Sequence, residues 1–443
     1  MGKIAVIGLD GAAPSLVFDR WRQQLPNLSA LMERGAWGEL RSVHPPITVP
    51  AWAVVFSGKD PGQLGIYGLR NRRAHDYSSQ AFAHSGLLPD DMLWDTFSRQ
   101  GKKVILLGVP PGYPPRPVNG CAVSCFLTPS SERPYTYPQS LRAEVEAVSG
   151  GYVHDVDNFR TGDKQDLLRR IYEKTRKHFA VARHLLATRE WDLFAMVEMG
   201  LDRLQHGFWA YFDAAHPDYV ADNPYESAVL DYYRYLDAEI GELLELIPEE
   251  ARLLVLSDHG ARALHGSLCF NEWLIRMGYL VLKDSPRRPA PLAPERIDWR
   301  RTRAWGEGGY YGRLFLNVRG REPEGVVEPG DVERLRGELV AAVAEIEAPG
   351  GGRLGCQALR PQDIYRETNG VPPDLMVYFG DLDWRAAGSV GNGCLHEHGT
   401  DIGPDQANHD WKGICIVRDR KTDSVGQLEG LRLTDIAATY IAT

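Results

Sequence analysis

The sequence predicts an α/β fold with a mostly parallel central sheet, helices on both faces of the sheet, and a cap or insertion. Short runs of continuous apolar residues, many of them β-branched, recur along the 443-residue chain and are separated by helical patterns. Strands that are apolar throughout are typical of parallel sheets covered on both faces. The runs cover residues 3–9, 103–109, 192–199, 252–257, 374–379 and 413–418.

The domain organisation follows from the length and from two irregular segments. A chain of 443 residues can form one large domain with insertions, or two domains. Residues 284–300 and 319–331 are rich in Pro, Arg or Gly and are typical of surface excursions. We expect a single catalytic domain over residues 1–443, with a cap or insertion over residues 264–335 inside it.

The clearest helical pattern lies in residues 223–248. Asn223 is suited to cap the helix, Pro224 to its first position, and Glu226 to a capping box. Apolar residues then recur every three or four positions and predict one buried face. These residues are Val229, Tyr233, Leu236, Ile240, Leu243 and Ile247.

Composition excludes several classes of partner. The net charge is −9 and no long basic stripe occurs, so we expect no nucleic acid polymer as partner. No stretch reaches the 18 or so apolar residues of a membrane span, and the first apolar run is too short for a signal peptide. The six cysteines form no CxxC pair, which favours reduced thiols. We therefore expect a cytoplasmic protein without a membrane partner.

Carboxylates and histidines follow three of the predicted strands. Asp10 ends the first strand, Asp202 and His206 follow the strand at 192–199, and Asp258 and His259 follow the strand at 252–257. In open parallel sheets, ligands bind beyond the carboxyl ends of the strands. Three distant segments should therefore bring these side chains to one edge of one sheet.

The spacing of these residues predicts metal binding. Asp202 and His206 stand four positions apart, so on a helix they face the same way and can share an ion. Asp258 and His259, at a corner between strand and loop, can turn toward a second ion. His409, just before the last strand, is a further candidate ligand. Mixed Asp and His ligands suit zinc, and manganese or iron would also fit.

Two other histidine positions have different interpretations. His396 and His398 stand two apart, and we interpret them as part of a loop more readily than as a metal site. His265 closely follows the SDHG segment and could reach the site from behind the ligands.

The stretch VHPPITVPAWAVVFSG, residues 43–58, places Thr48 at the mouth of a predicted helix. Taken alone, Thr48 is a helix cap, a role for which threonine is well suited. The same position favours an anion, because backbone N–H groups and the helix dipole point toward it. A nearby divalent ion would lower the pKa of the hydroxyl and make it a nucleophile, and two ions could serve an in-line phosphoryl displacement.

Five motifs together resemble the alkaline phosphatase superfamily, in particular its type I phosphodiesterase/nucleotide pyrophosphatase group with its phosphohydrolase and phosphomutase relatives. The motifs are IGLDG, PPITVPAWAVVFSGKDPGQLGIYG, GLDRLQH, LSDHG and GPDQANHDWKGI. The resemblance spans nearly the whole chain and implies an enzyme with two divalent ions, usually zinc, that acts on a small phosphorylated substrate.

The resemblance also assigns roles by motif position. Asp10, Asp258 and His259 would hold one ion with Thr48 at its side. Asp202, His206 and His409 would hold the other. Thr48 would form a covalent phospho-enzyme that water then hydrolyses. The residue types at all seven positions match those of the family.

The sequence departs from the family pattern where relatives contact the phosphate. Many relatives have a His in the PGxxGI stretch, where this chain has Leu64, and nucleotide pyrophosphatases have an Asn about twenty residues after the nucleophile. Asn71 is the nearest Asn here, so Asn71 and His265 are the candidate substrate contacts. Sulfatase relatives need a CxPxR-like motif at the nucleophile, and the stretch around Thr48 has none, so a sulfatase is excluded.

Alternatives to a phosphodiesterase remain open. A phosphomonoesterase or a phosphomutase acting on small phosphorylated metabolites would use the same residues. A binding protein that kept the fold without catalysis is a further alternative from a different functional class, although it would have no chemical need for all seven residues.

Overall fold

The computed structural model describes residues 2–419 and 425–442, and the chain folds into two compact units. The first unit comprises Met1–Leu69, Ala83–Arg262 and His409–Thr443. The second unit comprises Arg70–Phe82 and Ala263–Asn408, so the predicted cap segment 264–335 lies inside it. That the whole chain acts as one catalytic domain stays a prediction.

A ten-stranded sheet forms the centre of the first unit. Five of its strands are parallel neighbours in the order β9-β1-β8-β5-β6, and Val6 of β1 lies between Leu254 of β9 and Ala195 of β8. Their bounds are Arg252–Leu256 for β9, Ile4–Leu9 for β1, Leu193–Glu198 for β8, Val104–Leu107 for β5 and Gly120–Val123 for β6. Antiparallel strands extend both edges, and they include β21 (Lys412–Arg418), β2 (Ala36–Arg41) and β7 (Thr136–Tyr137). The predicted α/β fold class is confirmed.

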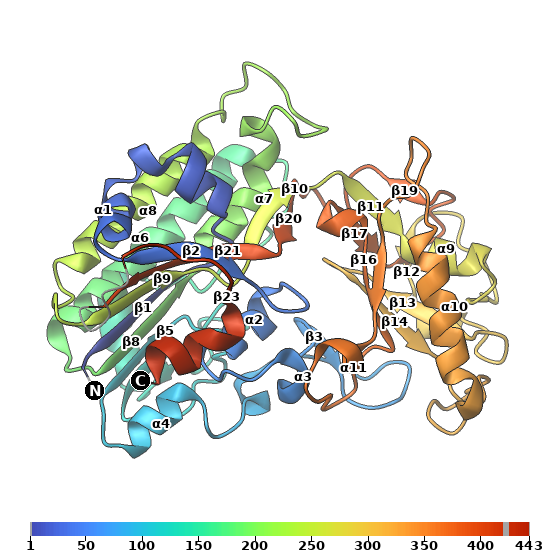
Figure 1. The fold of residues 1–443 in the computed structure, drawn as a ribbon, viewed down its shortest axis with the longest axis horizontal. Coiled ribbons are helices and arrows are strands. Elements are labelled where there is room, and N and C mark those ends of the chain that lie inside the picture. Colours follow the sequence, from blue (N-terminus) through green and yellow to red (C-terminus); the bar gives the residue numbers. More distant parts are fainter. Residues whose placement is uncertain (1, 420–424, 443) are drawn as a thin grey trace. The chain divides into compact units, whose positions relative to one another are not determined.

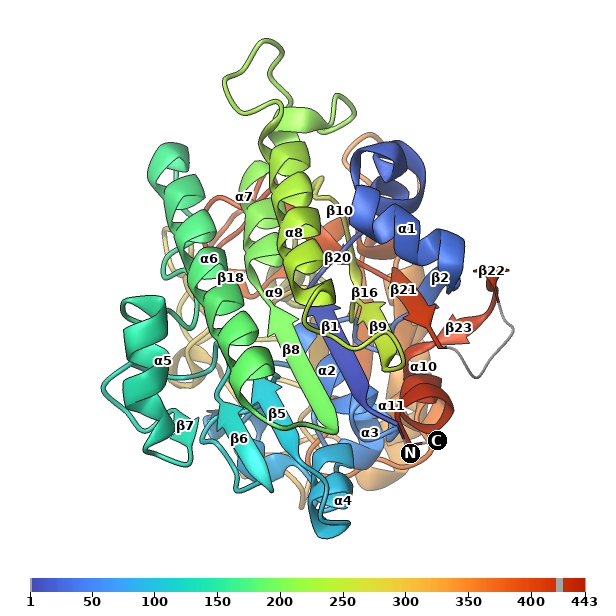
Figure 2. The same ribbon diagram turned by 90° about the vertical axis from the view of Figure 1, so that its left-hand side faces the viewer.

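Helices cover both faces of this sheet (Figures 1 and 2). On one face lie α1 (Pro26–Arg34), α6 (Lys164–Thr188), α7 (Gly200–Phe212) and α8 (Ala228–Leu244). On the other lie α2 (Thr48–Val55), α4 (Leu93–Arg99) and the last turns of the chain. Alternate strand residues such as Ile4 and Val6 pack into the core with α2 and α4, which explains why these strands are apolar throughout.

The helix predicted over residues 223–248 begins later than expected. Residues 224–227 form turns, and α8 starts at Ala228. Asn223 Oδ1 accepts a hydrogen bond from the backbone N of Tyr225 at 2.8 Å, so its side chain closes a local turn instead of capping the helix. The predicted apolar face is confirmed as buried.

The second unit contains a separate four-stranded sheet in the order β13-β14-β16-β15, with antiparallel neighbours throughout. Its strands are β13 (Ala304–Glu307), β14 (Gly312–Leu316), β15 (Gln357–Leu359) and β16 (Leu375–Tyr378). The placement of 374–379 in the parallel sheet was therefore wrong. All four residues of β16 are buried, beside a core that includes α9 (Phe270–Arg276) and α10 (Val332–Ala344), so its pattern resembles that of a parallel strand.

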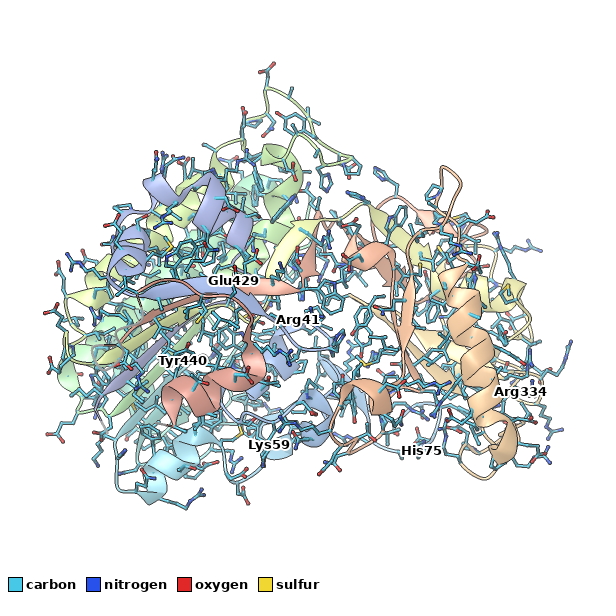
Figure 3. The ribbon with its side chains drawn as sticks, viewed as in Figure 1. Arg41, Lys59, His75, Arg334, Glu429 and Tyr440 are labelled. Atoms are coloured by element: carbon cyan, nitrogen blue, oxygen red, sulfur yellow. The ribbon has the colours of Figure 1, made fainter. Side chains whose placement is uncertain are left out.

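Residues 70–82 pack within the second unit although the first unit contains the chain on both sides of them. Arg72 and His75 both lie beside the buried carboxylate of Glu322, with N–O distances of 3.7 and 3.4 Å (His75 is labelled in Figure 3). The Tyr77 ring stacks on Trp299 with 3.5 Å between ring centroids. Contacts within the second unit therefore hold Arg72 and the residues that follow it in place.

Two observations relate to the cysteines and to membranes. The structure pairs none of the six cysteines in a disulfide, and their reduced state stays a prediction. Across residues 2–419 and 425–442, none of the helices combines the length and apolar character that crossing a lipid bilayer requires.

Candidate active site

The predicted ligands gather at the carboxyl ends of three adjacent strands, β9, β1 and β8. Asp10 directly follows β1, and Asp258 lies two residues beyond the end of β9. The chain turns from β8 into α7 with one residue between them, so Asp202 lies in the first turn of that helix. All three side chains are buried.

Asp202, His206 and His409 form a first group of converging ligand atoms. The distance from Asp202 Oδ1 to His206 Nε2 is 3.2 Å and to His409 Nε2 is 3.6 Å, and the two histidine Nε2 atoms are 3.4 Å apart. One ligand atom from each residue lies within 4.8 Å of the others, which is a spacing that could hold an ion. This grouping matches the expected second set.

A second group surrounds His259. Its Nε2 lies 3.6 Å from Asp10 Oδ1 and 3.2 Å from Asp258 Oδ2. One ligand atom from each of Asp10, Asp202 and His259 also lies within 4.8 Å of the others. The arrangement therefore differs from the expected one, because Asp202 lies close to both groups instead of one. Asp258 lies beside His259.

The Thr48 side chain points into this second group. Thr48 is the first residue of α2, and its Oγ1 donates a hydrogen bond of 3.3 Å to Asp10 Oδ1 and lies 3.5 Å from His259 Nε2. The residue in the N-cap position is Ile47, and no side chain caps this helix. The structure therefore contradicts the capping interpretation and places the hydroxyl among the carboxylates.

The charges of the site fit bound cations. Burial, together with the charge of Asp202, raises the pKa of Asp10 to about 8, and burial and Asp10 raise the pKa of Asp258 well above its usual value. Among the described residues, none makes a hydrogen bond with Asp258 Oδ2, although this oxygen is buried. Buried carboxylates in this state are stabilised by metal ions, which would hold them ionised.

The histidines are oriented for metal binding. Burial lowers the pKa of His259 to about 4, so the ring is neutral at physiological pH and has a lone pair available. Nδ1 of His259 lies 2.8 Å from the Gly260 carbonyl oxygen, and Nδ1 of His409 lies 2.7 Å from that of Pro46. When Nδ1 donates to these carbonyls, Nε2 is left as the ligand atom facing the carboxylates.

Two residues around the ligands were missed by the sequence analysis. Trp52 Nε1 donates to Asp10 Oδ2 at 2.7 Å, and Arg203 Nη1 donates to Asp202 Oδ2 at 2.6 Å. Arg203 is itself held by Asp155, through two hydrogen bonds of 2.9 Å. The sequence held a weak signal for both residues, because Trp52 stands one helical turn after Thr48 and Arg203 directly follows Asp202.

The Trp52 indole fits against β1 only because Gly8, a residue of this strand, has no side chain. A Cβ atom built on Gly8 would lie 2.4 Å from Trp52 Cη2. The IGLDG motif thus supplies the ligand Asp10 and, two residues earlier, the space for the ring that orients it.

We expect Trp52→Phe to weaken metal binding by about 10–100-fold, because it removes the hydrogen bond to Asp10 but keeps most of the packing. The measurement is a titration of the variant with metal, monitored by calorimetry. Trp94→Phe, in which a buried indole of α4 is changed, is the matched control and should leave the affinity unchanged. Equal affinities for the Trp52 variant and the unaltered protein would contradict the orienting role.

The remaining predicted positions lie in the second unit. Asn71 is buried in β3 (Arg70–Arg72), and His265 is exposed between β10 (Gly260–Ala263) and β11 (Gly266–Cys269). Their role as substrate contacts stays a prediction. His396 lies in the short strand β19 (His396–Glu397) instead of a loop, and its Nε2 lies 2.9 Å from the Glu347 carbonyl oxygen.

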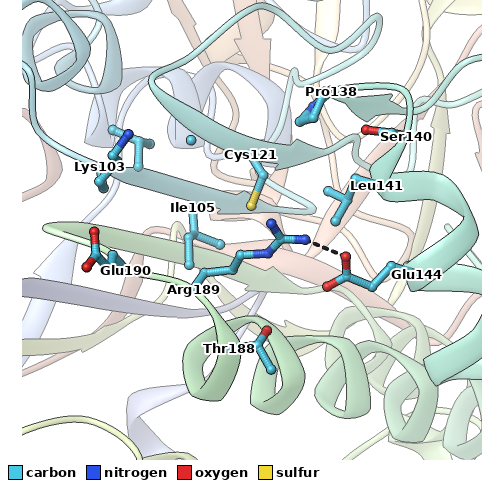
Figure 4. Close-up of a pocket in the computed structure, with 12 residues that line it drawn as sticks. Lys103, Ile105, Cys121, Pro138, Ser140, Leu141, Glu144, Thr188, Arg189 and Glu190 are labelled. Carbon is cyan, nitrogen blue, oxygen red and sulfur yellow. Dashed lines mark hydrogen bonds and ion pairs between the residues drawn. The ribbon is translucent and has the colours of Figure 1, made fainter.

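A cavity of about 560 Å³ occurs elsewhere in the first unit (Figure 4). It is lined by the starts of β5 and β6, with Arg189 and Glu144 forming an ion pair across it. These are the amino ends of the strands, opposite to the edge where ligands bind in parallel sheets. We therefore place the functional site at the carboxylate and histidine groups and not in this cavity.

Comparison with known proteins gives one family and several similar folds. The model of the family described as type I phosphodiesterase / nucleotide pyrophosphatase matches residues 4–403. GPI ethanolamine phosphate transferase 2 of Candida glabrata is 23% identical over 296 residues, which are 65% of this chain. The chain spans only 29% of the length of that relative.

Solved structures of similar fold include human ectonucleotide pyrophosphatase / phosphodiesterase 5, with a TM-score of 0.52, 13% identity, and coverage of 98% of this chain and 93% of the other. Phosphonoacetate hydrolase from Sinorhizobium meliloti 1021 in complex with phosphonoformate has a TM-score of 0.62 and 18% identity, covering 100% and 96% of the two chains. An inactive Thr-to-Ala variant of the murine phosphodiesterase 5, in complex with AMP, has a TM-score of 0.51 and 13% identity, covering 99% and 93%.

Proposed function

The chain belongs to the type I phosphodiesterase / nucleotide pyrophosphatase family, and we propose that it hydrolyses phosphoric esters with two divalent ions and Thr48 as nucleophile. Family membership confirms the predicted resemblance and supports the prediction of a phosphoester-hydrolysing enzyme. The observation that carries the proposal is the position of Thr48 Oγ1 within the second ligand group, 3.3 Å from Asp10 Oδ1 and 3.5 Å from His259 Nε2.

The ligand sets would follow the two groups of the site. Asp202, His206 and His409 would hold one ion, and Asp10, Asp258 and His259 the other, with Thr48 at its side. Zinc suits these mixed oxygen and nitrogen ligands best. When bound, such ions lower the pKa of a hydroxyl nucleophile and neutralise charge on the phosphoryl oxygens.

The chain's own residues would then act as follows. The hydrogen bond to Asp10 and the rigid Pro-rich frame hold Thr48 Oγ1 in place for in-line attack on phosphorus. The Oγ1–P bond forms while the bond from phosphorus to the leaving oxygen breaks, and the proton lost by the Thr48 hydroxyl is balanced by the one that the leaving oxygen gains. The products are a phosphorylated threonine and an alcohol. Water then attacks the phosphothreonine and releases phosphate or a phosphate monoester.

Two further observations support the proposal. The murine phosphodiesterase 5 of similar fold is described as inactive when a threonine is replaced by alanine. The relative from Candida glabrata is named as a transferase of ethanolamine phosphate. We propose a small phosphorylated substrate and a cytoplasmic location.

The proposal is tested with zinc-loaded protein on bis-p-nitrophenyl phosphate and on p-nitrophenyl phosphate. We expect the diester to be preferred, and we expect a chelator to abolish turnover of both until zinc is added back, because the carboxylates and histidines need the ions to position and activate Thr48. The control is chelator already saturated with zinc. A preference for the monoester would favour the phosphomonoesterase or phosphomutase alternative. No turnover of either ester by metal-loaded protein would contradict the proposal and favour a binding protein.

A further inference from the structure

A second set of metal-binding residue types lies in the second unit. It consists of Cys269 at the end of β11, Cys394 in the loop before β19, and Glu397 in β19. One ligand atom from each of the three lies within 4.8 Å of the others. Cys269 is wholly buried, whereas Cys394 and Glu397 are half-buried.

The pairing of the two strands explains why these side chains meet. β11 and β19 are antiparallel, with Ser267 opposite Glu397, and the backbone N of Cys269 donates to the Leu395 carbonyl oxygen at 2.8 Å. Opposed residues of a strand pair share a face, and residues two apart on one strand share it as well. Cys269 and Glu397 are therefore on the same face, and the loop brings Cys394 to them.

The loop that carries Cys394 is held in place. Glu272 Oε1 in α9 accepts hydrogen bonds from the backbone N atoms of Gly391 at 2.6 Å and Asn392 at 3.2 Å. The Asn392 amide nitrogen donates to Glu397 Oε1 at 2.5 Å. The geometry of a site would thus exist before an ion arrives, which reduces the entropy lost on binding.

One polar atom beside the cluster lacks a hydrogen-bond partner among the residues that the structure describes. Asn392 Oδ1 is buried and receives no hydrogen bond within residues 2–419 and 425–442. A cation would stabilise the thiolate, and it would offer the amide oxygen beside Glu397 a positive partner.

We propose that Cys269, Cys394 and Glu397 bind one zinc-class divalent ion, distinct from the two ions of the catalytic site. Thiolate ligands select zinc over magnesium or calcium, and both thiolate sulfur and carboxylate oxygen are among the ligand types that zinc takes in proteins. Three protein ligands leave one tetrahedral position to water or an amide oxygen. The site would tie the loop at Cys394 to the end of β11.

Cobalt substitution tests this inference on the full-length protein. The catalytic ligands are oxygen and nitrogen atoms only, so a sulfur-to-cobalt charge-transfer band in the near-ultraviolet reports the thiolate site alone. We expect the unaltered protein to bind three cobalt ions per chain and to show this band. Cys394→Ala should bind two ions and lose the band, with diesterase activity unchanged. Cys356→Ala, which removes another buried thiol of the same unit, should keep three ions and the band.

Several results would overturn the inference. One is the absence of the band in the unaltered protein, and another is its persistence in Cys394→Ala. Recovery of Cys269 and Cys394 as a disulfide from protein that binds no third ion would also overturn it. If Cys394→Ala does not fold, alkylation of Cys394 in the unaltered protein replaces it as the test, and zinc that fails to slow this alkylation would overturn the inference. Unaltered protein that shows the band but has no diesterase activity would instead count against the proposed function.

Discussion

Thr48→Ala is expected to lower turnover of a phosphate diester by about 10³-fold or more, with metal content unchanged. The reason is that the substitution removes Oγ1, the hydroxyl that contacts Asp10 and lies beside His259. Its effect on stability should be small, about 1 kcal/mol for one lost hydrogen bond. The measurement is kcat and KM of the zinc-loaded variant on bis-p-nitrophenyl phosphate, beside its bound zinc.

Thr48→Ser is the matched control, because it keeps the hydroxyl and loses only a methyl group. It should retain most of the activity and, like the unaltered protein, yield a phosphorylated residue 48 when the reaction is quenched in acid and examined by mass spectrometry. Full activity of Thr48→Ala would contradict the nucleophile assignment. A phosphoryl group found on another residue would contradict it equally.

Asp202→Asn is expected to remove at least one ion per chain and to lower turnover by about 10³-fold. Asp202 Oδ1 approaches both His206 Nε2 and His409 Nε2, and its carboxylate also belongs to the group around Asp10. An amide of the same shape keeps the packing but removes the negative charge that a divalent ion needs. The measurement is metal content after dialysis against a buffer of fixed free zinc, together with the rate of diester hydrolysis.

Asp155→Asn is the control for this experiment. Asp155 binds Arg203, the partner of Asp202, and it is not one of the ligands. Its substitution should therefore weaken metal binding by only about 10–100-fold, the effect of disturbing a group behind the ligands. Two ions bound by Asp202→Asn with unaltered affinity would show that the carboxylate of Asp202 is not a ligand of either ion.

The metal-free enzyme should bind zinc more weakly as pH falls below about 8. The pKa of Asp10 is raised to about 8 in the absence of an ion, so at lower pH the carboxyl is protonated and zinc has to displace the proton. The measurement is zinc affinity between pH 6 and 9, accompanied by the number of protons released. An affinity that does not change across this range would contradict the prediction.

Local patterns in the sequence were sufficient for much of the site. Asp10 and Asp258 could be placed because each follows a strand of continuous apolar residues, and parallel strands end at a common edge. Asp202 and His206 could be paired because one turn of helix separates them. The position of Thr48 at the start of a helix was also readable from the prolines around it.

Contacts between distant segments decided the rest. β16 has the same apolar pattern as the parallel strands, and only its neighbours β14 and β15 show that it belongs to an antiparallel sheet in the second unit. The hydrogen bond from Trp52 to Asp10 depends on space left by Gly8, and the reach of Asp202 into both ligand groups depends on where α7 starts. The sequence by itself therefore determined the residue types and the strand ends that carry them, because those follow from local periodicity. Which candidate ligands lie together and which residues orient them was decided by the tertiary structure, because distances between segments far apart in the chain are set by packing.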